Sequence, residues 1–323
     1  MTGATLRAVV VGAGRMGRIR AHHLAELGVE VAAVVDADQG RSRALAGELG
    51  CIASENAEEI DFRTLDLAVF CIPPGLRAGA DHRALREGAA LFLEKPAALE
   101  AGAIRDLMDS QRAGGAVAGV GYMHRARATV RRAREFVAAH GALAANVRWM
   151  GGAYNVGWWR DRSASGGPFN EQATHAIDLL VGLLGPVKEV GALADCSSAE
   201  SADVVAASLR FASGAVASLL YSCAIAEKDI GVDIYTAGGV VRLKGWDLDL
   251  ELGELVMAGD PHGDRNGVFR DEMADFIRAV RAGDEEAPLC TLESAYQTQR
   301  VVDEVIAAID NAEQASAPLR ASC

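Results

Sequence analysis

The stretch Ala8-Val9-Val10-Val11-Gly12-Ala13-Gly14-Arg15-Met16-Gly17 runs from an apolar segment directly into three glycines, and a helical pattern follows it through Leu24 and Leu27. It contains a Gly-x-Gly-x-x-Gly motif in a strand–turn–helix context. The first glycine permits the tight turn, the second lets the backbone approach a pyrophosphate, and the third lets the helix pack on the strand. We therefore expect a dinucleotide site formed by Gly12, Gly14, Arg15, Met16 and Gly17.

A second apolar strand, predicted over residues 29–35, ends in Asp36. This is where the acidic residue that holds the adenosine ribose is expected. A carboxylate there repels a 2′-phosphate, which favours NAD as the cofactor. Arg41 and Arg43 follow closely and can receive such a phosphate, so NADP stays an alternative. Asp36 as a simple turn residue is the less favoured interpretation.

Two further apolar strands end in residues suited to a ligand site. Residues 65–72 lead to Pro73-Pro74-Gly75, which should turn beneath the cofactor. Residues 89–93 lead to Glu94-Lys95-Pro96. Ligands of open α/β sheets bind beyond the carboxyl ends of the strands, so Lys95 is expected in a cleft, where its charge can stabilise a developing alkoxide. An isolated Glu-Lys pair would instead indicate a solvated strand end.

The predicted fold class is α/β, with two domains. Helical sequence up to Gly88 and over 100–112, followed by a strand over 116–122, predicts a doubly wound parallel sheet. We assign residues 1–122 to a Rossmann dinucleotide-binding domain. The remainder, residues 123–323, is predicted to be a substrate-binding and oligomerisation domain.

The pattern changes after a basic helix expected over 125–140. Strand-like alternation, with hairpin signals such as Ser213-Gly214, recurs at 143–149, 204–211, 215–221, 232–236 and 240–243. The second domain should therefore contain an open, mainly antiparallel sheet. Residues 269–282 and 291–309 indicate closing helices, and 315–323 a frayed tail.

The segment from Trp158 to Asp178 carries the candidate chemistry of the second domain. Asn170 is a good N-cap for a helix lasting to about Leu184, and Glu171, His175 and Asp178 then share one face. Acidic residues favour helix starts for dipole reasons alone, but Lys95 and the glycine motif favour a functional interpretation of Glu171 and His175. Aromatic surface and donors for a polyhydroxylated substrate are expected from Trp158, Trp159 and Arg160, although the tryptophans can instead pack the domain junction.

Composition restricts the partners and the compartment. With 32 basic and 44 acidic residues the formal charge is 32 − 44 = −12, which argues against nucleic-acid and anionic-membrane partners. The N-terminal apolar run is too short for a secretory signal, and no apolar span has membrane length. Six dispersed cysteines without a Cys-x-x-Cys pair suit reduced thiols better than disulfides or a metal site. We expect a soluble cytoplasmic protein.

Taken together, the glycine motif, Glu94-Lys95-Pro96, Gly121-Tyr122-Met123-His124-Arg125 and residues 166–178 resemble the glucose–fructose oxidoreductase / inositol dehydrogenase (Gfo/Idh/MocA) family. The resemblance implies hydride transfer between a nicotinamide and a sugar, amino sugar, cyclitol or related carbinol. It implies catalytic roles for Lys95 and His175, a substrate contact at Tyr122 and a cis bond before Pro96. It also implies a homodimer or homotetramer formed through the second sheet.

The chain departs from the family pattern at two positions. Glu171 stands where many members carry an aspartate, so its role is open. Arg77 stands where many carry a histidine, so no nicotinamide contact is carried over to it.

In the oxidative direction, the hypothesis is that His175 takes the carbinol proton, nicotinamide C4 receives the hydride, and Lys95 steadies the oxygen. Glu171 orients His175 or binds a neighbouring hydroxyl. The alternatives are a lyase or glycosidase that uses bound NAD only transiently, and a nucleotide-sensing protein without turnover. The intact set of Lys95, Glu171 and His175 argues against the last.

Overall fold

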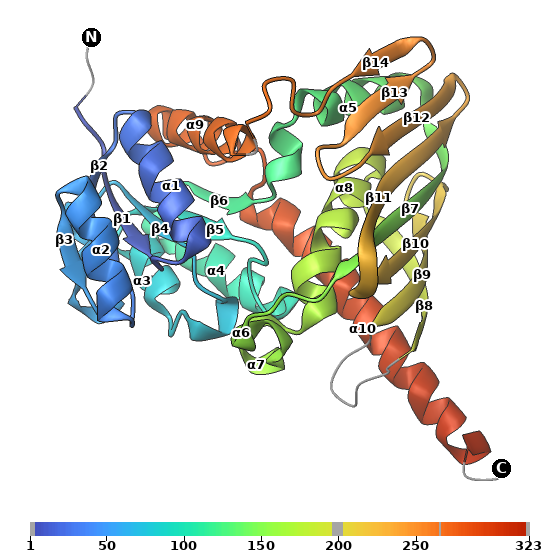
Figure 1. The fold of residues 1–323 in the computed structure, drawn as a ribbon, viewed down its shortest axis with the longest axis horizontal. Helices are drawn as coiled ribbons and strands as arrows, with labels where there is room; N and C mark the ends of the chain where they lie inside the picture. Colours follow the sequence, from blue (N-terminus) through green and yellow to red (C-terminus); the bar gives the residue numbers. More distant parts are fainter. Residues whose placement is uncertain (1–3, 196–202, 265, 321–323) are drawn as a thin grey trace. The chain divides into compact units, whose positions relative to one another are not determined.

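The computed structural model describes residues 4–195, 203–264 and 266–320 (Figure 1). The chain forms two compact units. The first comprises Met1–Ala126 and Asp264–Tyr296, and the second Arg127–Gly263 and Gln297–Cys323.

The first unit is built on a six-stranded sheet in which every neighbouring pair is parallel. The spatial order is β3-β2-β1-β4-β5-β6. The strands are β1 (Arg7–Val11), β2 (Glu30–Val35), β3 (Ile52–Ser54), β4 (Leu67–Phe70), β5 (Ala90–Glu94) and β6 (Ala118–Gly121). β4 and β5 are buried along their whole length. Both faces of these strands are covered, and this explains their nearly continuous apolar sequence. The predicted doubly wound parallel sheet is confirmed.

Helices cover both faces of this sheet (Figure 1). One face carries side chains of α1 (Arg15–Glu26), α2 (Gln39–Leu49) and α9 (Gly267–Ala282), including Leu24, Leu45 and Phe276. The other carries α3 (Ala80–Arg86) and α4 (Ala101–Gly114), through Ala84, Ile104 and their neighbours.

The second unit contains an eight-stranded sheet in the order β14-β13-β12-β11-β7-β10-β9-β8 (Figure 1). Its strands are β7 (Ala142–Gly152), β8 (Val187–Asp195), β9 (Val204–Phe211), β10 (Val216–Ser222), β11 (Ala224–Thr236), β12 (Gly239–Lys244), β13 (Asp249–Leu252) and β14 (Leu255–Met257). β7 and β10 pair in parallel, and the other neighbours are antiparallel. The mainly antiparallel sheet is therefore confirmed.

One face of the second sheet packs on helices, and strand residues such as those of β9 alternate between buried and exposed. The helices are α5 (Ala128–His140), α8 (Thr174–Leu184) and the later part of α10 (Leu292–Arg320), with Val130, Ile177 and Val301 among the contacts. The alternation is the expected consequence of covering one face only.

Three local features differ from the sequence-based expectation. The segment Asp264–Tyr296 packs with the first unit, where Phe276 lies edge-on to Phe92 with ring centroids 5.2 Å apart. β3, β8, β13 and β14 were not predicted, since they are short or lack a clear apolar alternation. The tail expected over 315–323 is helical as far as Arg320, and residues 321–323 lie outside the described chain.

Candidate active site

The glycine motif forms the turn between β1 and α1. Gly12 has φ of +102°, and a Cβ added there would lie 2.8 Å from the carbonyl oxygen of Cys71. A Cβ on Gly17 would lie 1.7 Å from the carbonyl oxygen of Gly12. A Cβ on Gly14 would meet no atom within 4 Å, so this position opens onto free space at the start of α1. The first and third glycines are thus required by packing, and the second leaves room where phosphates bind a helix N-terminus.

The strand register brings the glycine turn and Lys95 to the same end of the sheet. Val11 pairs with Phe70, and Phe70 pairs with Leu93, so the residues that follow leave the sheet at one level. These residues include Gly12 and the half-buried Lys95. The peptide bond between Lys95 and Pro96 is cis, as the resemblance implied. Pro73 begins the short helical turn η3 (Pro74–Leu76) after β4, at this same end.

Asp36, at the end of β2, is bound to the glycine turn. Its carboxylate accepts hydrogen bonds from the backbone N–H of Ala13 at 2.7 Å and of Asp38 at 2.8 Å. Arg41 lies 3.2 Å from Asp36 and 3.4 Å from Asp38. Because two carboxylates surround one guanidinium, the local charge is negative, which favours a ribose diol over a 2′-phosphate.

Glu94 is held by a buried arginine of α1. Arg20 is fully buried and donates from Nε to Glu94 at 2.7 Å and from Nη2 to Glu272 at 2.5 Å. Its guanidinium lies 4.7 Å from the ring centroid of Phe92 and 5.2 Å from that of Phe269. Burial lowers the pKa of Arg20, but the two carboxylates together raise it above its usual value, so the group stays charged.

The second unit presents His175 between two tryptophans. The imidazole stacks on Trp149 with centroids 5.8 Å apart and an interplanar angle of 21°, and Trp246 meets it edge-on at 6.1 Å. His175 as a whole residue is 6% exposed. These aromatic contacts fix the plane of the imidazole.

The segment before His175 is a π-helical turn, Phe169–Ala173, and the expected N-cap at Asn170 is therefore wrong. The Asn170 side chain instead donates to the Ser165 carbonyl at 2.8 Å and accepts from Gln299 at 2.7 Å. A π-helical turn is frequent at functional sites, and here side-chain hydrogen bonds hold it in place.

Glu171 and Asp178 each accept a hydrogen bond from a different residue. Glu171 accepts a hydrogen bond from the indole N–H of Trp159 at 3.0 Å, and Asp178 accepts one from Thr298 at 3.1 Å. Glu171, His175 and Asp178 are all buried, but Asp178 joins α8 to α10 and has a structural contact. The Glu171 carboxylate is thus oriented by Trp159.

The other predicted substrate residues differ in exposure. Trp158 is 39% exposed. Nη1 of Arg160 lies 3.6 Å from Oδ1 of Asp203. Trp159 is fully buried and Tyr122 is 1% exposed, so the geometry gives both of them packing contacts. Their direct contact with a substrate stays a prediction without geometric support.

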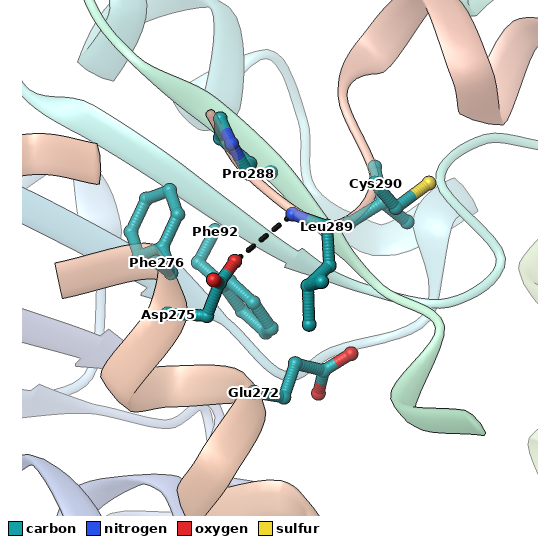
Figure 2. Close-up of a pocket in the computed structure, with 9 residues that line it drawn as sticks. Phe92, Glu272, Asp275, Phe276, Pro288, Leu289 and Cys290 are labelled. Atoms are coloured by element: carbon teal, nitrogen blue, oxygen red, sulfur yellow. Dashed lines mark hydrogen bonds between the residues drawn. The ribbon is translucent and has the colours of Figure 1, made fainter. Parts of the chain in front are cut away.

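A small cavity lies between β5, β6 and α9 (Figure 2). Figure 2 shows the Asp275 carboxylate directed at the backbone N–H of Leu289, at 3.0 Å. The cavity volume is about 10 Å³, enough for about one water molecule. It is a packing feature and not the predicted site.

Sequence reasoning missed several residues that position the site. Arg20 falls in the buried stripe Gly17, Arg20, Ala21 and Leu24, and a charge in that stripe was a usable signal. Trp149 and Trp246 gave none, since they are far from His175 in sequence. Within the described ranges, no three His, Cys, Asp or Glu side chains form a group able to hold a metal. No described helix is both long and apolar enough to cross a membrane.

Two family models match the chain. The oxidoreductase family model with an NAD-binding Rossmann fold matches residues 6–122, and the GFO/IDH/MocA C-terminal domain model matches residues 130–242. The fold and the glycine turn define an NAD-binding oxidoreductase domain joined to a second α/β domain. The chain belongs to the Gfo/Idh/MocA family of oxidoreductases.

Two curated relatives match parts of the chain. A putative UDP-kanosamine synthase oxidoreductase subunit of Amycolatopsis mediterranei (strain S699) is 31% identical over 193 residues, covering 56% of this chain and 52% of the relative. Inositol 2-dehydrogenase of Rhizobium meliloti (strain 1021) is 34% identical over 103 residues, covering 31% of each. The chain thus matches about half the length of the first relative and a third of the second.

Solved structures share the fold along nearly the whole chain. GenD2 from gentamicin A biosynthesis, in complex with NAD, has a TM-score of 0.82 at 21% identity and covers 97% of this chain and 96% of its own. Levoglucosan dehydrogenase in complex with NADH has a TM-score of 0.84 at 18% identity, covering 95% and 98%. The TM-scores show a common fold, and at identities this low the likeness shows the fold alone.

Proposed function

We propose that this protein is an NAD-dependent dehydrogenase or reductase. It transfers hydride between the nicotinamide and a carbinol or carbonyl carbon of a sugar, amino sugar, cyclitol or related small polar molecule. The observation that supports this proposal most directly is the strand register, which brings Lys95 and the glycine turn to one end of the parallel sheet. The solved structures similar to it include one named as bound to NAD and one as a levoglucosan dehydrogenase with NADH.

The cofactor site comprises the glycine turn and Asp36, with Arg41, Pro73 and Glu94 at its border. NAD, when bound, supplies or accepts the hydride. Open space at Gly14 and the start of α1 suit a pyrophosphate, and the Asp36 carboxylate suits a ribose diol. NAD is favoured over NADP because Arg41 is already paired with Asp36 and Asp38.

Lys95, Glu171 and His175 are the proposed catalytic residues. In the oxidative direction the His175 imidazole accepts the carbinol proton, and the Lys95 ammonium donates a hydrogen bond to the reacting oxygen. Glu171, oriented by Trp159, borders the substrate from the π-helical turn. Lys95 belongs to the first unit and His175 to the second.

The substrate class is tested with sugars, amino sugars and inositols, read by the absorbance of NADH. Lys95→Met should lose turnover while NAD affinity stays, because transition-state contacts appear in kcat more than in binding. Lys188→Met, at an exposed lysine of β8, is the control and should keep full activity. Net NADH formation separates the proposal from a lyase or glycosidase that reuses bound NAD, since such an enzyme accumulates none.

We also propose a cytoplasmic homodimer or homotetramer that associates through the second sheet. Its uncovered face carries exposed apolar side chains on several strands, including Leu193 (71% exposed), Val216 (44%) and Tyr235 (42%). Apolar side chains gathered on an uncovered face favour association. Light scattering at micromolar concentration gives the mass, and a monomer contradicts this part of the proposal.

A further inference from the structure

We propose that Arg77 is a positioning residue that fixes the backbone on both sides of Lys95 and thereby sets the place of its ammonium group. This inference rests on the proposed catalytic role of Lys95. It gives a role to the arginine that stands where the family pattern has a histidine.

Arg77 follows the η3 turn and is 4% exposed. Nη1 donates to the carbonyl oxygen of Ala97 at 2.5 Å. Nη2 donates to the carbonyl oxygens of Glu94 at 3.0 Å and Pro96 at 3.2 Å. One of these three carbonyls precedes Lys95 in the chain and two follow it, so a single guanidinium holds the whole segment.

The segment needs such a donor because the sheet ends here. β5 pairs with β4 as far as Leu93 and with β6 as far as Glu94. The carbonyls of Pro96 and Ala97 lie beyond both ladders, and buried carbonyls require donors from elsewhere. A planar guanidinium offers several N–H groups in a fixed geometry, which neither lysine nor histidine reproduces.

The charge of Arg77 is directed to the backbone. Burial lowers the pKa of Arg77 to about 10, and Asp81, 3.8 Å away, acts in the opposite direction, so the group is charged at neutral pH. Both Nη atoms are engaged by the chain's own carbonyls. Arg77 therefore acts on the backbone around Lys95.

A second arginine holds the same segment by a different group. Arg20 binds the side chain of Glu94, whereas Arg77 binds its carbonyl oxygen. The residue before Lys95 is thus fixed at both its side chain and its backbone, from two separate elements of the first unit. This arrangement leaves the Lys95 backbone little freedom, as precise catalytic geometry requires.

The test compares Arg77→Met with Arg83→Met. Arg83 is a matched control, because it donates to the carbonyl oxygens of Glu58, Ala57 and Ile60 at 3.1, 2.6 and 2.7 Å, in the same unit but away from Lys95. Arg77→Met should lower kcat by about 10²-fold, the loss typical of a small misplacement, with the Kd for NAD nearly unchanged. Arg83→Met should lower only the melting temperature. Equal kcat in wild type and Arg77→Met overturns the inference.

A double variant shows whether Arg77 acts through Lys95. Adding Arg77→Met to Lys95→Met should cause no further loss of kcat, since residues that act as a unit are not additive. A second loss of about 10²-fold in the double variant contradicts the inference. An active Lys95→Met protein refutes the proposed role of Lys95 itself, whereas an inactive Lys95→Met with an active Arg77→Met refutes only the inference.

Arg77→Lys is the second variant if Arg77→Met fails to fold. It keeps a positive charge but cannot reach three carbonyls together. With a circular dichroism spectrum like that of the wild type, it should still lose most of its kcat. Wild-type kcat in this variant overturns the inference.

Discussion

Replacing Arg20 by methionine should destabilise the first unit strongly. The substitution leaves Glu94 and Glu272, whose side chains are 11% and 4% exposed, without the cation that both contact. Breaking a buried ion pair by removing one partner costs about 3–5 kcal/mol, and the lost cation–π contacts with Phe92 and Phe269 add roughly 1 kcal/mol. This is a large share of the roughly 5–15 kcal/mol that stabilises a typical native protein.

The assay is urea unfolding followed by far-UV circular dichroism. Tryptophan fluorescence would report on the second unit, because that unit contains all four tryptophans, Trp149, Trp158, Trp159 and Trp246. Arg18→Met is the control on the same helix. Arg18 pairs with Glu48 at 2.6 Å but is half exposed, and exposed pairs contribute little.

The Arg20→Met protein should also respond to pH in a specific direction. Burial without a cation raises the pKa of a carboxyl above its unfolded value. A raised pKa in the folded state gives stability that is present at low pH and is lost as pH rises through that pKa. Arg20→Met should therefore be more stable in mild acid than at neutral pH, and adding Glu272→Gln should recover part of the loss. A loss below about 1 kcal/mol, or one shared by Arg18→Met, would refute the reasoning.

Two further predictions concern the proposed site. Asp36→Ala should narrow the preference for NAD over NADP in calorimetric titrations, and equal or tighter NADP binding by the unmodified protein would reject the role of Asp36. His175→Ala should slow the oxidative reaction by about 10²–10⁴-fold and remove the acid limb of its pH profile, as loss of a general base does. His140→Ala, at the exposed end of α5, is its control, and an acid limb that survives in His175→Ala would assign the proton to another group.

Local sequence was sufficient for much of the fold. The glycine turn is set by steric contacts over a few residues, as the short distances at Gly12 and Gly17 show. Apolar runs predicted the buried parallel strands, and alternation predicted the antiparallel strands, because side-chain period reflects how many faces are covered. Lys95 could also be predicted as a site residue, because it follows an apolar strand and ligands bind at the carboxyl ends of such strands.

Tertiary structure alone decided how the site residues are held. Arg20 contacts Glu94 and Glu272, which are 74 and 252 residues away in sequence. Trp246 contacts His175 from the loop between β12 and β13. The packing of Asp264–Tyr296 with the first unit is likewise a contact between segments that are far apart in the sequence. Such contacts form because buried charges and apolar surfaces need partners, and these partners can lie far away in the sequence. The periodicity of side chains along a helix or strand therefore does not predict them.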